Sequence, residues 1–370
     1  MRDTLKSIWN FACKNPVFAI ATIAATITSF IVRPDSQYLD YIDYKTLTCL
    51  FCVLAVVCAL KNVNFFYILA RRIVTGFNTA RRCVAALLVI TFAGSMLIAN
   101  DMALLTFLPL GYFVLSVTGM EKYMAFTFVL QNIAANLGGM LTPFGNPQNL
   151  YLYSHYNIPG MEFVGIMLPP FVLSMLLLGL CCLFIGNDTL RLPQAEPQVV
   201  RKRTITYLAL MCLAIAIVFR GIPYWVGLLV IPPVIWMLDK QALKMVDYPL
   251  LLTFVAFFIF AGNMSRIEPV RQLMSYLMAQ NTLVYSTMSC QFISNVPSAI
   301  LLSQFTDNYR ELLWGVNIGG VGTLISSLAS LITFREYGRH YPEKRGRYVC
   351  LFLLVNFVFL AALLAFCLCL

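Results

Sequence analysis

Charged residues are scarce in this chain, and histidine is almost absent. Only 11% of the 370 residues are Asp, Glu, Lys or Arg, and there are 2 histidines, whereas soluble proteins carry about 25% charged residues. Hydrophobic residues make up 60% of the chain, which is more apolar surface than a soluble domain can hide. The composition therefore excludes a soluble globular protein and indicates that lipid surrounds most of the chain. The shortage of histidine also argues against a His-based metal site.

Signatures of nucleotide binding and catalysis are missing as well. The run Gly319-Gly320-Val321-Gly322 lacks the Lys-Ser/Thr pair of a P-loop and does not follow a soluble strand. Cys49 and Cys52 have the spacing of a redox or metal motif, but no His or acid accompanies them, so we interpret them as small apolar helix residues. We expect a protein that is not an enzyme and that needs no cofactor.

Long apolar stretches dominate the chain, and nine of them can cross a hydrocarbon core of about 30 Å as helices. Two further stretches, 84–118 and 273–306, carry polar residues near their middle, which predicts re-entrant hairpins. The expected fold class is an all-α polytopic membrane protein with inverted structural repeats. The nine predicted spans are 12–32, 45–61, 123–152, 163–186, 205–220, 223–238, 247–264, 312–334 and 348–370.

The net charge of +10 is not distributed as in a nucleic-acid-binding protein. If the N-terminus is cytoplasmic, 20 of the 26 Lys and Arg residues lie on the cytoplasmic side of the predicted spans, as the positive-inside rule requires. We therefore expect a multi-pass protein of the cytoplasmic (inner) membrane, with membrane lipid and no nucleic acid as partner, and with its C-terminus outside. The same topology opens the two hairpins toward opposite faces, which is the relation that an inverted repeat requires.

One polar signature occurs twice. The segment from Asn136 to Asn149 reappears from Asn317 to Ser330, with the first Asn, two Gly and a Thr at matching places. Each copy follows a second Asn within an apolar run, Asn100 or Asn295. Doubled apolar segments that Gly or Pro interrupts indicate the central site of a secondary transporter. The expected organisation is a first repeat 1–187 with an amphipathic interfacial helix 62–82, hairpin 84–118 and broken helix 123–152; a cytoplasmic linker 188–203; and a second repeat 204–370 with hairpin 273–306 and broken helix 312–334.

Hairpin tips and broken helices leave backbone groups free to bind ions. Pro143 and Pro147 break the first companion helix, and Gly319, Gly320 and Gly322 are expected to break the second more gently. Side-chain oxygens near these breaks suit Na⁺, and amide donors suit a carboxylate or oxyanion. The predicted Na⁺ ligands are Asn100, Asp101, Thr142 and Asn149 in a first half-site and Asn295, Thr323, Ser326 and Ser330 in a second, and the predicted anion donors are Asn146, Gln148, Ser294 and Asn295.

Asp101 is the one acidic residue that we place deep in an apolar stretch. Because burying a charge in a membrane is costly, an ionisable residue at this depth is a functional candidate. Asp101 either ligates Na⁺ as an anion or carries a proton. The alternative is a protonated Asp101 that only caps the second helix of the hairpin.

These motifs resemble the ion transporter superfamily, which holds divalent anion/sodium symporters, citrate carriers, arsenite permeases and a Na⁺/H⁺ antiporter group. The resemblance covers nearly the whole chain, and the Gly-Asn-Pro-Gln-Asn run and the Asn100-Asp101 pair are closer to the arsenite permease and antiporter branch. It implies a homodimer in which a transport domain slides as an elevator. It also implies that Gly145 joins the cation site and that Pro147, Val296, Pro297, Gly319 and Gly320 contact the substrate.

Two functions within transport are open from the sequence. The first is a secondary active transporter that moves a small organic acid or oxyanion together with Na⁺ or H⁺, and the alternative is a Na⁺/H⁺ antiporter with Asp101 as the exchanging ligand. A channel would need a continuous polar path, and two hairpins that enter from opposite faces argue for a closed central site instead.

Overall fold

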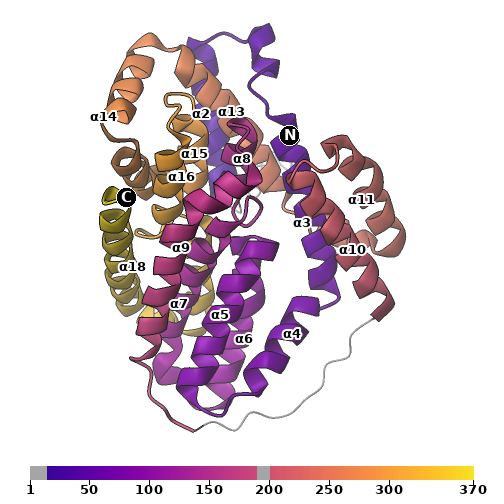
Figure 1. The fold of residues 1–370 in the computed structure, drawn as a ribbon, viewed down its shortest axis with the longest axis vertical. Helices are drawn as coiled ribbons and strands as arrows, with labels where there is room; N and C mark the ends of the chain where they lie inside the picture. Colours follow the sequence, from indigo (N-terminus) through magenta and orange to yellow (C-terminus); the bar gives the residue numbers. More distant parts are fainter. Residues whose placement is uncertain (1–14, 190–200) are drawn as a thin grey trace, which may run out of the picture.

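The computed structural model describes residues 15–189 and 201–370, with the side chains of 74–75 and 201–202 left aside (Figure 1). Most of the predicted linker 188–203 and the start of the predicted span 12–32 lie outside the described residues. The α-helices are α2 (Pro16–Ile31), α3 (Tyr44–Asn62), α4 (Phe65–Thr75), α5 (Ala80–Ile98), α6 (Asn100–Val117), α7 (Met124–Gly138), α8 (Pro147–His155), α9 (Gly160–Cys182), α10 (Arg201–Val218), α11 (Tyr224–Leu238), α12 (Lys240–Lys244), α13 (Tyr248–Arg266), α14 (Glu268–Ile293), α15 (Asn295–Leu302), α16 (Tyr309–Ile318), α17 (Leu328–His340) and α18 (Arg345–Leu368).

Within the described residues, seven helical segments are long and apolar enough to cross a membrane, and α2, α10 and α11 are shorter apolar helices. Large apolar side chains on the outer helices face outward: Phe30 on α2 and Met237 on α11 are each 83% exposed. Such side chains are stable outside only where lipid replaces water. The prediction of an all-helical polytopic membrane protein is confirmed.

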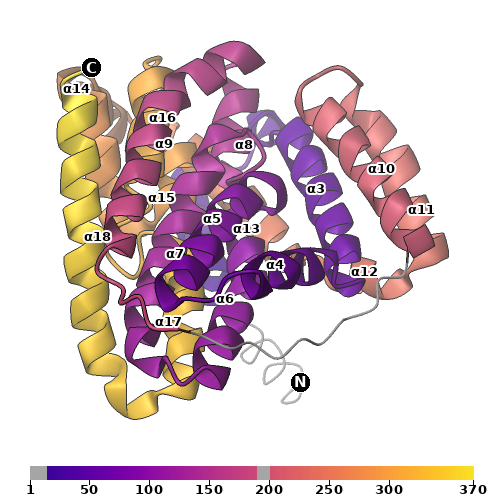
Figure 2. The same ribbon diagram turned by 60° about the horizontal axis from the view of Figure 1, so that its bottom comes forward.

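The helices form two groups that pack against each other. In the first group α3 lies against α10, α11 and α12, and α2 lies along α13; Figure 2 shows α10 and α11 beside α3 and away from α7 and α18. The second group contains α5, α6 and α7 together with α14 to α18. Figure 1 shows α5 and α6 in its lower half and α14 and α15 in its upper half, so the two pairs approach the middle from opposite ends.

Both predicted hairpins are pairs of helices with a one-residue turn. The first is α5 and α6, which meet at Ala99, and the second is α14 and α15, which meet at Ser294. Helix α14 also bends at Asn281, whose φ and ψ of −165° and 94° are not helical, so its arm of the hairpin begins after that residue. The amphipathic helix predicted over 62–82 is shorter in the structure, where α4 covers Phe65–Thr75.

The expectation of a gentler second break is wrong. The first companion helix is interrupted between α7 and α8, where a short 3₁₀ segment, Gly139–Leu141, keeps part of the gap helical. The second is interrupted between α16 and α17 over residues 319–327, which form turns and bends without a 3₁₀ segment like that of the first break. The three glycines of the second break unwind the backbone as far as the two prolines of the first. Gly322 adopts φ = +132°, a conformation that residues with a Cβ avoid.

Close backbone contact between α5 and α7 gives a first prediction. A Cβ added at Gly138 would collide with the carbonyl of Phe92 and lie 2.6 Å from Ser95 Oγ. We expect Gly138→Ala to lower the stability of the purified protein by about 1–3 kcal/mol, the usual cost of overpacking, as a lower Tm in detergent. Gly179→Ala in α9 is the matched control, because no atom lies within 4 Å of its added Cβ. Equal melting of both variants would contradict the close contact.

Candidate functional site

The turns of both hairpins have the same unusual geometry. Ala99 has φ = 63° and Ser294 has φ = 75°, and neither residue is glycine. A positive φ with a side chain present costs free energy, so surrounding contacts must hold it. They do so equivalently: the Asn100 amide N–H donates to Gly145 O at 3.1 Å, and the Asn295 amide N–H donates to Ser326 O at 2.9 Å. Each hairpin tip is thus bound to the break of its own companion helix.

The side chains of the tip asparagines repeat the same pattern. Asn100 Oδ1 accepts the N–H of Asp101, and Asn295 Oδ1 accepts the N–H of Val296, both at 2.9 Å. Asn100 Nδ2 in addition donates to Asn136 Oδ1 at 3.1 Å. These contacts place the predicted residues Asn100 and Asn295 at the two breaks, as the sequence motif predicts.

Threonines fix the other side of each break. Thr142 Oγ1 donates to Met96 O at 2.7 Å, and Thr323 Oγ1 donates to Gln291 O at 3.0 Å. Ser326 Oγ donates to Gly320 O at 2.9 Å within the second break. The predicted cation ligands Thr142, Thr323 and Ser326 are therefore engaged with backbone carbonyls here, and their hydroxyl oxygens keep accepting capacity.

Asn317 joins the two halves. Its Oδ1 accepts Asn146 Nδ2 at 3.1 Å and Gln148 Nε2 at 3.4 Å, and its Nδ2 donates to Asn149 Oδ1 at 2.6 Å. All four side chains are buried, with exposed fractions of 1% or less. A second link joins Asn132 on α7 to Ser330 and Thr333 on α17, both at 3.4 Å. The predicted residues Asn146, Gln148, Asn149 and Ser330 thus form one central polar cluster.

Several acceptor oxygens in this region have no hydrogen-bond partner among the described residues. They are buried atoms of Asp101, Asn146 and Gln148, namely Oδ1, Oδ1 and Oε1. Unpaired buried acceptors are costly, and native proteins keep few of them unless an ion, water or ligand completes the site. Asp101 lies in the first turn of α6, and its symmetric counterpart in α15 is the apolar Val296.

The remaining predicted residues frame the cluster. Pro147 is the first residue of α8, and Pro297 lies in the first turn of α15. Gly139 and Gly145 lie in mutual backbone contact, since a Cβ at Gly139 would come within 2.7 Å of Gly145 O. A Cβ at Gly320 would lie 3.1 Å from Asn295 Nδ2, and Gly319 packs against Cys290 of the hairpin.

Sequence reasoning missed Asn132, Asn136, Asn317 and Gln291 as site residues. The first three lie on α7 and α16 within or just before the duplicated motif, so their position was available as a signal. Gln291 lies in a hairpin arm that also carries Thr282, Ser286, Thr287 and Ser289, so only its contacts in the structure distinguish it.

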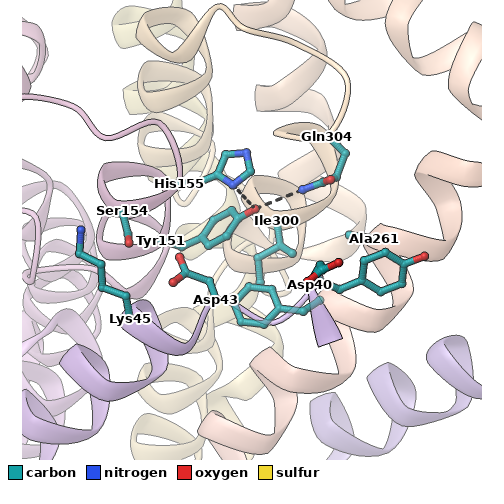
Figure 3. Close-up of a pocket in the computed structure, with 12 residues that line it drawn as sticks. Asp40, Asp43, Lys45, Tyr151, Ser154, His155, Ala261, Ile300 and Gln304 are labelled. Atoms are coloured by element: carbon teal, nitrogen blue, oxygen red, sulfur yellow. Dashed lines mark hydrogen bonds between the residues drawn. The ribbon is translucent and has the colours of Figure 1, made fainter. Parts of the chain in front are cut away.

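A polar cavity of about 410 Å³ lies beside the C-terminal half of α8 (Figure 3). Tyr151 stands at its centre, with its hydroxyl 2.8 Å from Ser303 Oγ and 3.4 Å from His155 Nδ1 and Gln304 Nε2. Tyr151 follows Gln148 by three residues on α8, so the two side chains start about 4.5 Å apart along the helix axis. The cavity is lined by Asp40, Tyr41, Asp43, Lys45, Tyr151, Ser154, His155, Phe258, Ala261, Gly262, Ile300 and Gln304.

Comparison with known proteins finds transporters among the relatives of this chain. A model of the citrate transporter family (CitMHS) matches residues 8–309. The uncharacterized transporter MJ0456 of Methanocaldococcus jannaschii is 30% identical over 306 residues, which cover 82% of this chain and 84% of that protein. The inner membrane protein YbiR of Escherichia coli is 29% identical over 305 residues, 80% of each chain. The silicon efflux transporter LSI3 of Oryza sativa subsp. japonica is 30% identical over 150 residues, 40% of this chain and 30% of that protein.

The fold and the relatives define a class first: a multi-pass membrane transporter. More narrowly, the chain belongs to the CitMHS citrate transporter family within the ion transporter superfamily.

The bridge made by Asn317 gives a second prediction. Asn317→Ala would leave Gln148 Nε2 and Asn149 Oδ1 unpaired, each at about 1–3 kcal/mol, and would leave Asn146 Nδ2 with Asn136 O as its one remaining partner. We expect a clearly lowered Tm in detergent and loss of transport in proteoliposomes. Asn356→Ala is the matched control, because Asn356 is equally buried but its amide donates only to Phe352 O in its own helix. An Asn317 variant no less stable than the control would refute the bridging role.

Proposed function

We propose that this protein is an ion-coupled secondary active transporter that moves a small organic acid or oxyanion across the cytoplasmic membrane. The observation that carries the proposal is the convergence of two equivalent tip-and-break units on the one amide cluster around Asn317. The relatives' names support transport as the activity, and the name of YbiR supports the inner membrane as the location.

The anion is proposed to bind at the amide cluster. Asn146 Nδ2 and Gln148 Nε2 both donate to one oxygen, Asn317 Oδ1, so a carboxylate oxygen at this place would receive the same pair of donors. Helices α8 and α17 both begin at the cluster, and a helix N-terminus favours negative charge. Ser327, the N-cap of α17, already accepts the Ser330 N–H there.

The coupling ion is proposed to bind in the first half-site, beside Asp101. The donor set fits Na⁺, a hard cation that takes oxygen ligands: a carboxylate with an unpaired buried oxygen, the tip residue Asn100 and the carbonyls of the break. The same carboxylate suits a proton. A Na⁺/H⁺ antiporter is the second candidate function, and the unpaired oxygen of Asp101 favours it because one carboxylate would exchange both ions.

Alternating access is proposed to follow the division into two groups of helices. The hairpins and broken helices would move as the transport domain against α2, α3 and α10–α13, as in an elevator. The inverted repeats 1–187 and 204–370, a cytoplasmic N-terminus, an outside C-terminus and a homodimer belong to the same proposal.

Ligand-induced stabilisation tests the substrate class. We expect dicarboxylates, citrate or oxyanions such as arsenite to raise the Tm of the purified protein by mass action, and the rise to increase with added Na⁺ or at lower pH. Stabilisation by Na⁺ alone, reversed by acid and indifferent to every anion, would favour the antiporter. No effect of any anion or cation would refute both functions.

Substitution of Asp101 tests the coupling. We expect Asp101→Asn to fold, because the amide has the same shape, but to lose the Na⁺ or pH dependence of transport in proteoliposomes. Glu343→Gln serves as the control, since Glu343 is an exposed residue in the short 3₁₀ helix Pro342–Lys344 before α18. If the Asp101 variant keeps the cation dependence of the unmodified protein, Asp101 only caps α6.

A further inference from the structure

Gln291 inserts its side-chain amide into the second break. It lies on the arm of α14, four residues before the tip residue Asn295. Its Nε2 donates to Gly319 O at 2.9 Å, Val321 O at 3.2 Å and Thr287 O at 3.3 Å. Its Oε1 accepts the Thr323 N–H at 2.9 Å. Because carbonyl oxygens need a donor and the Thr323 amide needs an acceptor, these partners fix which end of the side chain is nitrogen.

Two of these acceptors, Gly319 O and Val321 O, belong to unwound helix backbone, whereas Thr287 O belongs to α14 itself. Unwound carbonyl oxygens that meet at one place are the usual ligands of Na⁺ in carriers of this architecture. An NH₂ group carries two donors and a partial positive charge, so it satisfies the same oxygens without an ion. The backbone has adapted to it: at Gly322, which has φ = +132°, an added Cβ would collide with Gln291 Oε1. The space between the carbonyls is therefore filled by the protein itself.

The first half differs at the equivalent position. The bond from Thr142 Oγ1 to Met96 O matches the bond from Thr323 Oγ1 to Gln291 O, so Met96 is the counterpart of Gln291 and has no donor. An amide reaches the carbonyls of the first break only from α8: Asn149 Nδ2 donates to Gly139 O, Met140 O and Thr142 O at 3.2–3.5 Å, against 2.9–3.3 Å for Gln291 Nε2. The one carboxylate, Asp101, also belongs to this half.

We propose that the amide of Gln291 is a built-in substitute for a cation in the second half-site, so that one coupling cation binds per cycle and it binds in the first half-site. This inference rests on the proposed ion-coupled function. It makes Gln291 and Met96 the pair of residues that sets the cation stoichiometry.

The experiment measures anion uptake into proteoliposomes against graded Na⁺, and separately against graded pH, for the unmodified protein and three variants. The number of cations limits the Hill coefficient, so we expect a coefficient near one for the unmodified protein. Gln291→Glu replaces the donor with a carboxylate among carbonyls, and Gln291→Met reproduces the first half; we expect both to raise the coefficient toward two. Met96→Gln brings an amide into the first half-site and should reduce the apparent cation affinity at least tenfold.

Gln272→Met is the control, because Gln272 lies on the same helix, is exposed and bonds only to Glu268. A coefficient near two for the unmodified protein would overturn the inference while leaving ion coupling intact. Unchanged cation dependence in Met96→Gln, together with a coefficient near one in both Gln291 variants, would also overturn it. If a Gln291 variant does not fold, the unmodified protein and Met96→Gln still decide. Absence of any cation effect in the unmodified protein refutes the proposed function itself.

Discussion

Backbone N–H and C=O groups in the middle of a membrane need partners, and in this protein that need shapes the site. Neither a hairpin turn nor a broken helix can satisfy its own polar groups there. Each half solves the problem by placing a hairpin tip against a break, with Asn100 N–H bound to Gly145 O and Asn295 N–H bound to Ser326 O. The strained turns at Ala99 and Ser294 persist because these bonds hold them.

From this arrangement the central polar cluster follows. Once each tip is bound to its own break, the two breaks face each other, and side chains from both halves meet at Asn317. Helices α8 and α17 then start at the centre, and their N-termini favour an anion there. The two half-sites have a similar backbone but differ in chemistry. The position of Asp101 in the first half is taken by Val296 in the second, and the position of Met96 is taken by Gln291. The proposal of a single cation site rests on that difference.

Much of the architecture was predictable from particular residues. The apolar stretches predicted the helices, and the polar residues within 84–118 and 273–306 predicted the turns at Ala99 and Ser294. The duplicated motif placed Gly145 opposite Ser326, and the structure gives both the same hydrogen-bond role. The bend at Asn281 has a local partner, since Asn281 Oδ1 accepts the Val284 N–H at 2.8 Å. The longer unwinding of the second break was not predictable, because the hairpin residue Gln291 bonds to its carbonyls.

The sequence by itself determined that lipid surrounds most of the chain, and it determined the class of fold and the positions of both breaks. Hydrophobicity, proline and glycine act locally, so their effects can be recognised without knowing what lies nearby. Only the tertiary structure decided which polar side chains meet. Asn317 forms hydrogen bonds with residues almost half the chain away. Gln291 donates to backbone carbonyls of the second break, which lie near it only when the hairpin is docked against that break. Hydrogen bonds depend on distances of a few tenths of an ångström between atoms, and the spacing of residues along a chain does not contain those distances.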